Sequence, residues 1–289
     1  MKQLKILFGR AVEKVSVLPI KVLSQGMAVP VGHMTHKLMS AMDKPEEFKS
    51  LLDRDYAEMS DINCVFRFAC SRGHFAAVRL MLEECRPLIT QKLDSSLVEA
   101  VRLSPEPYET AKALLEHGAK PVAQSHFING SGAIHEAASH NQPELVALLL
   151  QHGADPRMKC KEGHEPLEYA VGQPYCNLYS SAKVVDALVK AGADLHLNND
   201  QALRSATLLG DKETVSCLLQ AGADKNIVDD KGRNLLQIAE AGIDHANNNK
   251  GYYGDRLPLV LKAHEETVEL VKKTLFPTIA PGAPKPPKM

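Results

Sequence analysis

Hydrophobic and polar residues follow a helical period through most of the chain. In PELVALLLQHG (143–153) apolar residues recur every three or four positions and the segment ends at a glycine, as in an amphipathic helix closed by a left-handed C-cap. The same ending recurs in LLEHGAK, LVKAGADL and LLQAGADK, with the glycines at Gly118, Gly153, Gly192 and Gly222. These glycines are 35, 39 and 30 residues apart, which predicts a repeated structural unit.

A shorter apolar segment precedes each of these helices. It reads SLVEAV, AIHEAAS, EPLEYAV and ALRSATLLG, and an alanine follows the leucine or isoleucine by three positions each time: Ala100, Ala137, Ala170 and Ala206. Small residues at this spacing allow one helix to lie close against another. Each unit is therefore predicted to be helix, turn, helix and loop. A single unit cannot bury its apolar face, so neighbouring units must stack.

Two segments, GAIHEAASHNQPELVALLLQHGAD (132–155) and DKGRNLLQIAEAG (230–242), resemble the ankyrin repeat, a β-turn and two helices over about 33 residues. A third copy, NCVFRFACSRGHFAAVRLMLEEC (63–85), has Cys85 where the family has glycine. Six recognisable copies cover roughly 62–275. The resemblance implies an all-α ankyrin-repeat solenoid of helix-turn-helix units, with an N-terminal cap and an extended C-terminal tail.

The expected organisation has three parts. Residues 1–34 form a basic N-terminal segment, residues 35–275 form the solenoid with a degenerate cap at 35–61, and residues 276–289 form a proline-rich tail. Two copies carry inserts that are predicted to enlarge their inter-helix turns. These inserts read QPYCNLYSS and NNNKGYYGDR.

Charge is balanced overall but unevenly distributed. The chain has 34 Lys and Arg against 35 Asp and Glu, which argues against nucleic-acid binding. Residues 41–271 carry 24 bases and 34 acids, whereas both ends are basic. The N-terminal bases beside apolar residues fit either an anionic membrane surface or a cover for the first repeat. The six scattered cysteines indicate reduced thiols and a cytoplasmic location, and no apolar run spans a membrane.

Catalytic and metal sites are not expected. HEAASH (135–140) differs from the zinc motif HExxH because the second histidine stands at i+5, so His135 and His140 diverge on a helix. We interpret His135 as a structural residue that hydrogen-bonds the adjacent turn, and Cys70 as a small core residue. An enzyme would need its site in the inserts or in the first 60 residues, where His33, His36 and Asp43 cluster. No cofactor is implied.

The resemblance implies that partners bind the concave face, at the ends of the first helices and at the loop tips. The expected function is non-enzymatic recognition of a protein partner through the concave face and the enlarged inter-helix turns, as an adaptor, an inhibitor or a bacterial effector in a host cytosol. The alternatives are a membrane-associated scaffold that uses the basic N-terminus, and an enzyme with its site in the N-terminal segment or the inserts. Loop tips include Asn63, Asp94, Ser131, His164 and Asp200. The candidate contact residues are Arg72, Arg102, Leu103, His140, Gln173, Tyr175, Tyr179, Leu208, Leu209, Arg233, Tyr252 and Tyr253.

Overall fold

The computed structural model describes residues 33–52, 59–89, 92–122, 129–171 and 181–276. Its secondary-structure elements in these ranges are helices, and the extended pairing between them is an isolated bridge from Val228 to Asn234. The chain divides into two compact units, residues 1–128 and 129–289. The basic N-terminal segment up to residue 32 and the tail from residue 277 lie outside the described residues, so the predicted three-part organisation stays a prediction.

The first unit contains seven helices among its described residues. They are α1 (His33–Ser40), α2 (Pro45–Leu52), α3 (Met59–Arg72), α4 (Phe75–Glu84), α5 (Arg86–Ile89), α6 (Leu93–Leu103) and α7 (Pro107–Glu116). The first helix of each repeat packs on the first helix of the next, α1 on α3 and α3 on α6. The second helices pack in the same way, α2 on α4 and α4 on α7. Two layers result, and the fully buried side chains of Phe48, Phe66 and Leu97 lie in the core of this unit.

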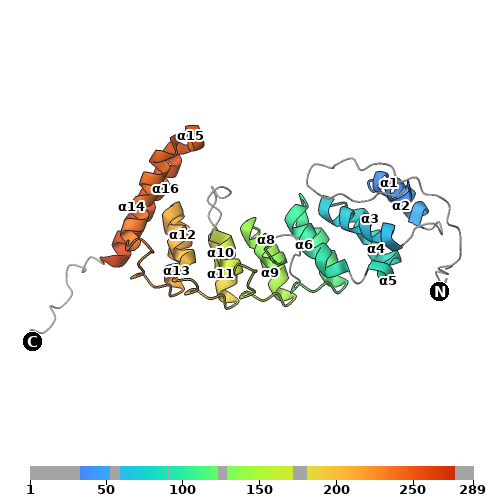
Figure 1. Ribbon diagram of the computed structural model, residues 1–289, viewed down its shortest axis with the longest axis horizontal. Coiled ribbons are helices and arrows are strands. Elements are labelled where there is room, and N and C mark those ends of the chain that lie inside the picture. The colour runs from blue at the N-terminus through green and yellow to red at the C-terminus, as the bar shows by residue number, and fades with distance from the viewer. Residues whose placement is uncertain (1–32, 53–58, 90–91, 123–128, 172–180, 277–289) are drawn as a thin grey trace, which may run out of the picture. The chain divides into compact units, whose positions relative to one another are not determined.

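The second unit repeats the same arrangement. Its helices are α8 (Ala133–Ser139), α9 (Pro143–Gln151), α10 (Pro166–Val171), α11 (Ala182–Lys190), α12 (Gln201–Leu209), α13 (Lys212–Gln220), α14 (Leu235–Asn248), α15 (Lys250–Tyr253), the 3₁₀ turn η2 (Gly254–Arg256) and α16 (Leu257–Leu275). One layer runs through α8, α10, α12 and α14, and the other through α9, α11, α13 and α16 (Figure 1). The predicted all-α repeat architecture is confirmed.

The four repeat glycines end the second helices as the pattern predicts. All have a positive φ, and at Gly153 (φ 87°) the following residue's N–H bonds back to the carbonyl of Leu149 at 2.9 Å. A glycine reaches this left-handed conformation without a Cβ clash. Cys85, which stands at the glycine position of its repeat, does not adopt the left-handed conformation. Its φ is −110°, and the chain continues directly into the short helix α5.

The insert around NNNKGYYGDR differs from the sequence-based expectation. Residues 249–256 do lengthen the connection between α14 and α16, but α14 itself runs to Asn248 and the connection contains α15 and η2. Ala246, within the lengthened part of α14, is fully buried, and α14 packs against α16. Asn and Gly are ordinarily turn signals, but packing between two long helices overrides that local preference here.

Two glycines and a histidine form the tightest packing between α12, α14 and α16. A Cβ placed on Gly242 would lie 2.6 Å from the carbonyl oxygen of Leu208 and 2.7 Å from Nδ1 of His264. A Cβ on Gly210 would lie 2.5 Å from the same ring nitrogen. Distances this short leave no room for a methyl group. The absence of side chains at these two positions therefore sets how closely α14 and α16 approach the end of α12.

Gly242→Ala is expected to destabilise the second unit by about 1–3 kcal/mol, the usual cost of overpacking. Alanine ordinarily stabilises a helix interior relative to glycine by about 0.5–1 kcal/mol, so this substitution should have the opposite sign. Gly251→Ala in α15 is the matched control, because nothing lies within 4 Å of its added Cβ. Urea denaturation of both variants checks the prediction. Equal midpoints would contradict the close packing at Gly242.

Candidate partner-binding surface

The first unit presents arginines at the ends of its two central first helices. Arg72 ends α3 and is exposed, and Arg102 and Leu103 end α6 and are half-buried. The guanidinium carbon of Arg72 lies 5.7 Å from the centre of the Phe68 ring, a cation–π distance. These three predicted contact residues lie on neighbouring helices that pack against one another.

An ion pair joins the same two helices. The guanidinium of Arg67 donates from Nε to Oε2 of Glu99 at 3.2 Å and from Nη2 to the other carboxylate oxygen. Glu99 is buried, and its hydrogen bond raises the pKa of Arg67. A bidentate pair of this kind fixes both side chains. Sequence reasoning missed this contact, because the two residues are 32 positions apart and charged residues on helices ordinarily face solvent.

In the second unit the ends of the first helices differ in chemistry. His140 follows α8 and is exposed. Leu208 is exposed at 36% and Leu209 is half-buried, at the end of α12. Ala206 and Leu203, on the other side of the same helix, are fully buried. The predicted exposed leucine is therefore present at the helix end, while Gln173, Tyr175 and Tyr179 lie outside the described residues.

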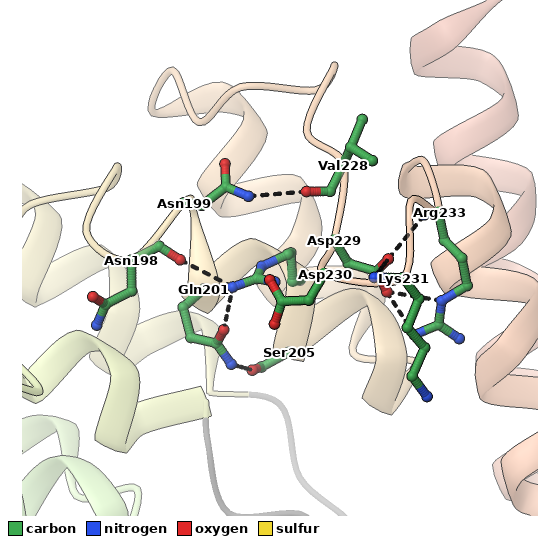
Figure 2. Close-up of polar contacts among 10 residues, drawn as sticks. Asn198, Asn199, Gln201, Ser205, Val228, Asp229, Asp230, Lys231 and Arg233 are labelled. Atoms are coloured by element: carbon green, nitrogen blue, oxygen red, sulfur yellow. Dashed lines mark hydrogen bonds and ion pairs between the residues drawn. The ribbon is translucent and has the colours of Figure 1, made fainter.

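Several loop tips that the sequence assigned to the surface are engaged within the chain. Arg233 is half-buried and pairs with Asp229, with 2.6 Å between Nη2 and Oδ2 (Figure 2). Ser131 is fully buried and donates to Glu136 at 2.5 Å. Asp200 is also buried and accepts a hydrogen bond from the backbone N–H of Asp224 at 3.1 Å. Their first role is to hold the loops rather than to face a partner.

Adjacent loop tips of the second unit are hydrogen-bonded to one another. Figure 2 shows the Asn199 side chain donating to the carbonyl of Val228 at 2.9 Å. Arg204 donates to the carbonyl of Asn198 at 3.0 Å and approaches Asp230 at 3.5 Å. This network crosses from one repeat to the next and holds the tips in register. It was not predicted, since polar loop residues give no local sign of their partner in the next repeat.

In three repeats a carboxylate near the start of the first helix binds the loop that ends the same repeat. In the repeat of α10 it is Glu165, which accepts from the backbone N–H of Asp194 at 3.4 Å. Asp94 accepts from the backbone N–H of Lys120 at 2.7 Å, as Asp200 does from Asp224. Both N–H groups belong to the second residue after a repeat glycine, Gly118 or Gly222. This fixed relation to the repeat glycine is a sequence signal that could have identified the two aspartates as structural.

Tyr252 and Tyr253 lie on the short helix α15, where their rings form an edge-to-face pair with centroids 5.2 Å apart. Tyr252 is exposed at 54%. The two rings thus contact one another and Tyr252 stays open to solvent, which fits the predicted contact role.

The residues that superficially suggest catalysis have structural contacts. His135 is fully buried, accepts the N–H of Gly132 at Nδ1 at 3.0 Å and has Nε2 3.3 Å from the carbonyl of His164. Burial lowers the pKa of His135, so the ring is neutral. The interpretation of His135 as a residue that hydrogen-bonds the adjacent turn is confirmed. Burial also raises the pKa of the Cys70 thiol, which keeps it protonated and unreactive.

Asp43, from the N-terminal group of ionisable residues, contacts a histidine outside that group. Oδ1 of Asp43 lies 2.9 Å from Nδ1 of His74 in the turn between α3 and α4. His36 is exposed on α1. Within the described ranges, no three His, Cys, Asp or Glu side chains are grouped to hold a metal ion. None of the helices in those ranges has the length and apolar character needed to cross a bilayer.

Comparison with known proteins agrees with this geometry. The sequence profile of ankyrin repeats, in three copies, matches residues 122–199. The chain contains ankyrin repeats over these residues. It is 30% identical over 125 residues to an ankyrin repeat protein of fowlpox virus, which covers 42% of this chain and 16% of the viral protein.

Other ankyrin-repeat relatives match segments of similar or shorter length. Human ankyrin repeat and SOCS box protein 16 is 28% identical over 140 residues, or 47% of this chain and 29% of the relative. A BTB/POZ domain and ankyrin repeat-containing protein of Medicago truncatula is 43% identical over 60 residues, or 21% of this chain and 12% of the relative. The ankyrin-repeat chain thus spans less than a third of each of these relatives.

Proposed function

We propose that this chain recognises a protein partner through the ends of its first helices and performs no catalysis itself. Ankyrin repeats are generally protein–protein interaction modules, and the recognition role follows from that class. The more specific role, as an adaptor, an inhibitor or an effector acting in the cytoplasm, belongs to the same proposal. The relatives named above support the module and not any one of these roles.

The observation that carries the proposal is the exposed leucine at the end of α12. Leu208 is solvent-exposed and Leu209 beside it is half-buried, although Leu203 and Ala206 of the same helix are fully buried. Exposed aliphatic side chains in neighbouring positions offer contact area that a partner can bury.

Leu208→Lys is expected to weaken binding of the natural partner by about 2 kcal/mol, roughly a thirtyfold loss of affinity, because a buried apolar contact becomes a charge. The free protein should lose little stability, since Leu208 is already exposed. Tyr108→Lys is the matched control: Tyr108 is exposed at 39% but lies on α7, a second helix. Proteins captured by the wild-type chain from a lysate of its source cells, and their affinities for both variants, provide the measurement.

The two variants also identify the outcome that contradicts the proposal. A captured protein that tolerates Leu208→Lys but is lost with Tyr108→Lys would place recognition on the second helices. Equal loss with both variants, together with a lowered urea midpoint, would assign the effect to folding rather than to contact.

A further inference from the structure

The exposed face of α3 and the end of α6 form a continuous strip with an unusual balance of charge. We call this strip the arginine stripe; it consists of Arg67, Phe68, Ser71, Arg72, Arg102 and Leu103. All six residues are exposed or half-buried, whereas Val65, Phe66, Ala69 and Cys70 on the opposite side of α3 are fully buried. The positions on α3 repeat every three to five residues, so they share one helix face.

The charges of the arginine stripe are only partly neutralised within the chain. Glu99 is the carboxylate that faces the stripe, and both of its oxygens are bonded to Arg67. In the part of the chain that the structure describes, neither Arg72 nor Arg102 forms an ion pair. Nε of Arg102 is buried there without a hydrogen-bond partner. Two guanidinium groups therefore keep a full positive charge at equivalent ends of adjacent helices.

Phe68 organises the centre of the stripe. Its ring lies under the guanidinium of Arg72, at 5.7 Å, and is stacked near His74 with 6.3 Å between ring centroids. His74 is in turn held by Asp43 at 2.9 Å. These contacts hold Arg72 beside an apolar surface, where its planar group can still form paired hydrogen bonds with a carboxylate.

The surroundings of the stripe make this local charge distinctive. Residues 41–271 carry more acids than bases by ten, from 34 against 24, so the stripe is a basic strip on an acidic body. The end of α12, which holds the corresponding position in the second unit, has Leu208 and Leu209 instead of arginines. Basic character is thus not a general property of the first-helix ends in this chain.

We propose that the arginine stripe binds an acidic segment of the partner protein. Asp or Glu side chains of that segment pair with Arg72 and Arg102, and an apolar side chain between them lies against Phe68 and Leu103. The proposal rests on the recognition function proposed above and adds the chemistry of the partner. Charge complementarity selects an acidic peptide, and the guanidinium pair sets its orientation on the two helices.

The test measures the binding of a short fluorescein-labelled peptide built from Glu and Leu to the full chain at low salt, by fluorescence anisotropy. A peptide of the same length with Gln in place of Glu is the ligand control. The test variant is Arg72→Glu with Arg102→Glu. The protein control, Arg79→Glu with Lys112→Glu, changes the net charge equally but lies on α4 and α7, both second helices with exposed side chains at these positions.

We expect the double reversal on the stripe to weaken binding of the Glu peptide by tenfold or more, and the control pair to weaken it by less than about threefold, since charges on another face act only at long range. Added salt should weaken binding to the wild-type chain. Arg72→Gln with Arg102→Gln, which removes the charge without introducing repulsion, should also lose affinity and covers the case in which the Glu pair fails to fold.

Three results would overturn the proposal. They are equal loss of affinity in both charge-reversal pairs, equal binding of the Gln peptide, and binding of a single-stranded RNA of matched charge as tightly as the Glu peptide.

Capture of the natural partner distinguishes failure of this inference from failure of the proposed function. Capture that depends on Leu208 while the Glu peptide fails to bind would remove only the acidic-segment inference. Peptide binding that depends on the stripe while capture ignores Leu208 would remove only the Leu208 site.

Discussion

Leu149→Asp is expected to unfold the repeat that contains α9. Leu149 is fully buried, and its helix packs against α11 in the second unit. Truncation of a buried leucine alone costs about 2–5 kcal/mol, and an unpaired carboxylate in the same place adds a desolvation cost. A total near or above 5 kcal/mol is comparable to the stability of a whole domain. Urea denaturation followed by circular dichroism, with hydrogen exchange of α9, measures the effect.

Gln151→Asp is the control for this substitution. Gln151 is the last residue of the same helix and is exposed, so the new charge stays in water. An acid near a helix C-terminus costs about 0.3–1 kcal/mol, which sets the expected size of the control effect. Similar urea midpoints for the two variants would mean that Leu149 does not occupy the core and that the repeat register is incorrect.

Acidification should destabilise the second unit through His264. This side chain is buried between Gly210 and Gly242, and its Nδ1 has no hydrogen-bond partner among the described residues. Burial, together with the nearby charge of His245, lowers the pKa of His264 to about 4. The unfolded chain, with an ordinary histidine pKa of about 6.5, therefore binds a proton first as the pH falls. The folded state therefore has its full stability with respect to His264 above pH 6.5, where the histidine is neutral in both states.

Between about pH 6.5 and pH 4 the folded state should lose about 3 kcal/mol from this residue alone. Free energies of unfolding from urea titrations at intervals of pH measure the loss. His264→Gln should flatten the curve in this range, because the glutamine does not titrate. His135, whose pKa burial also lowers, contributes to the slope that remains. An unchanged slope in His264→Gln would contradict the assignment to this residue.

The local pattern predicted the helices and their ends because those features depend on neighbours along the chain. The apolar period of 143–153 identified the buried face of α9, including Leu149, and the repeat glycines identified the left-handed ends. The exposed Leu208 was also predicted, since it follows the small-residue face of α12 in the repeat register. Hydrogen bonding of His135 to its turn followed from the same register.

The contacts between repeats needed the tertiary structure. Arg67 and Glu99 are 32 positions apart, and Arg233 looked as available as Arg72 although Asp229 binds it. The insert around Asn248 reads as a turn, yet α14 runs to Asn248 and the connection to α16 contains the short helices α15 and η2.

The sequence by itself thus determined the repeat unit, its two helices and its apolar faces, because hydrophobic period and glycine placement act over a few residues. Only the tertiary structure decided which charges remain free to meet a partner. A charge loses that freedom when the next repeat supplies an opposite charge or a backbone N–H, and the stacking of repeats places these groups. For that reason Arg72 and Arg102 form no ion pair among the described residues, while Asp94, Asp200 and Arg233 serve the fold.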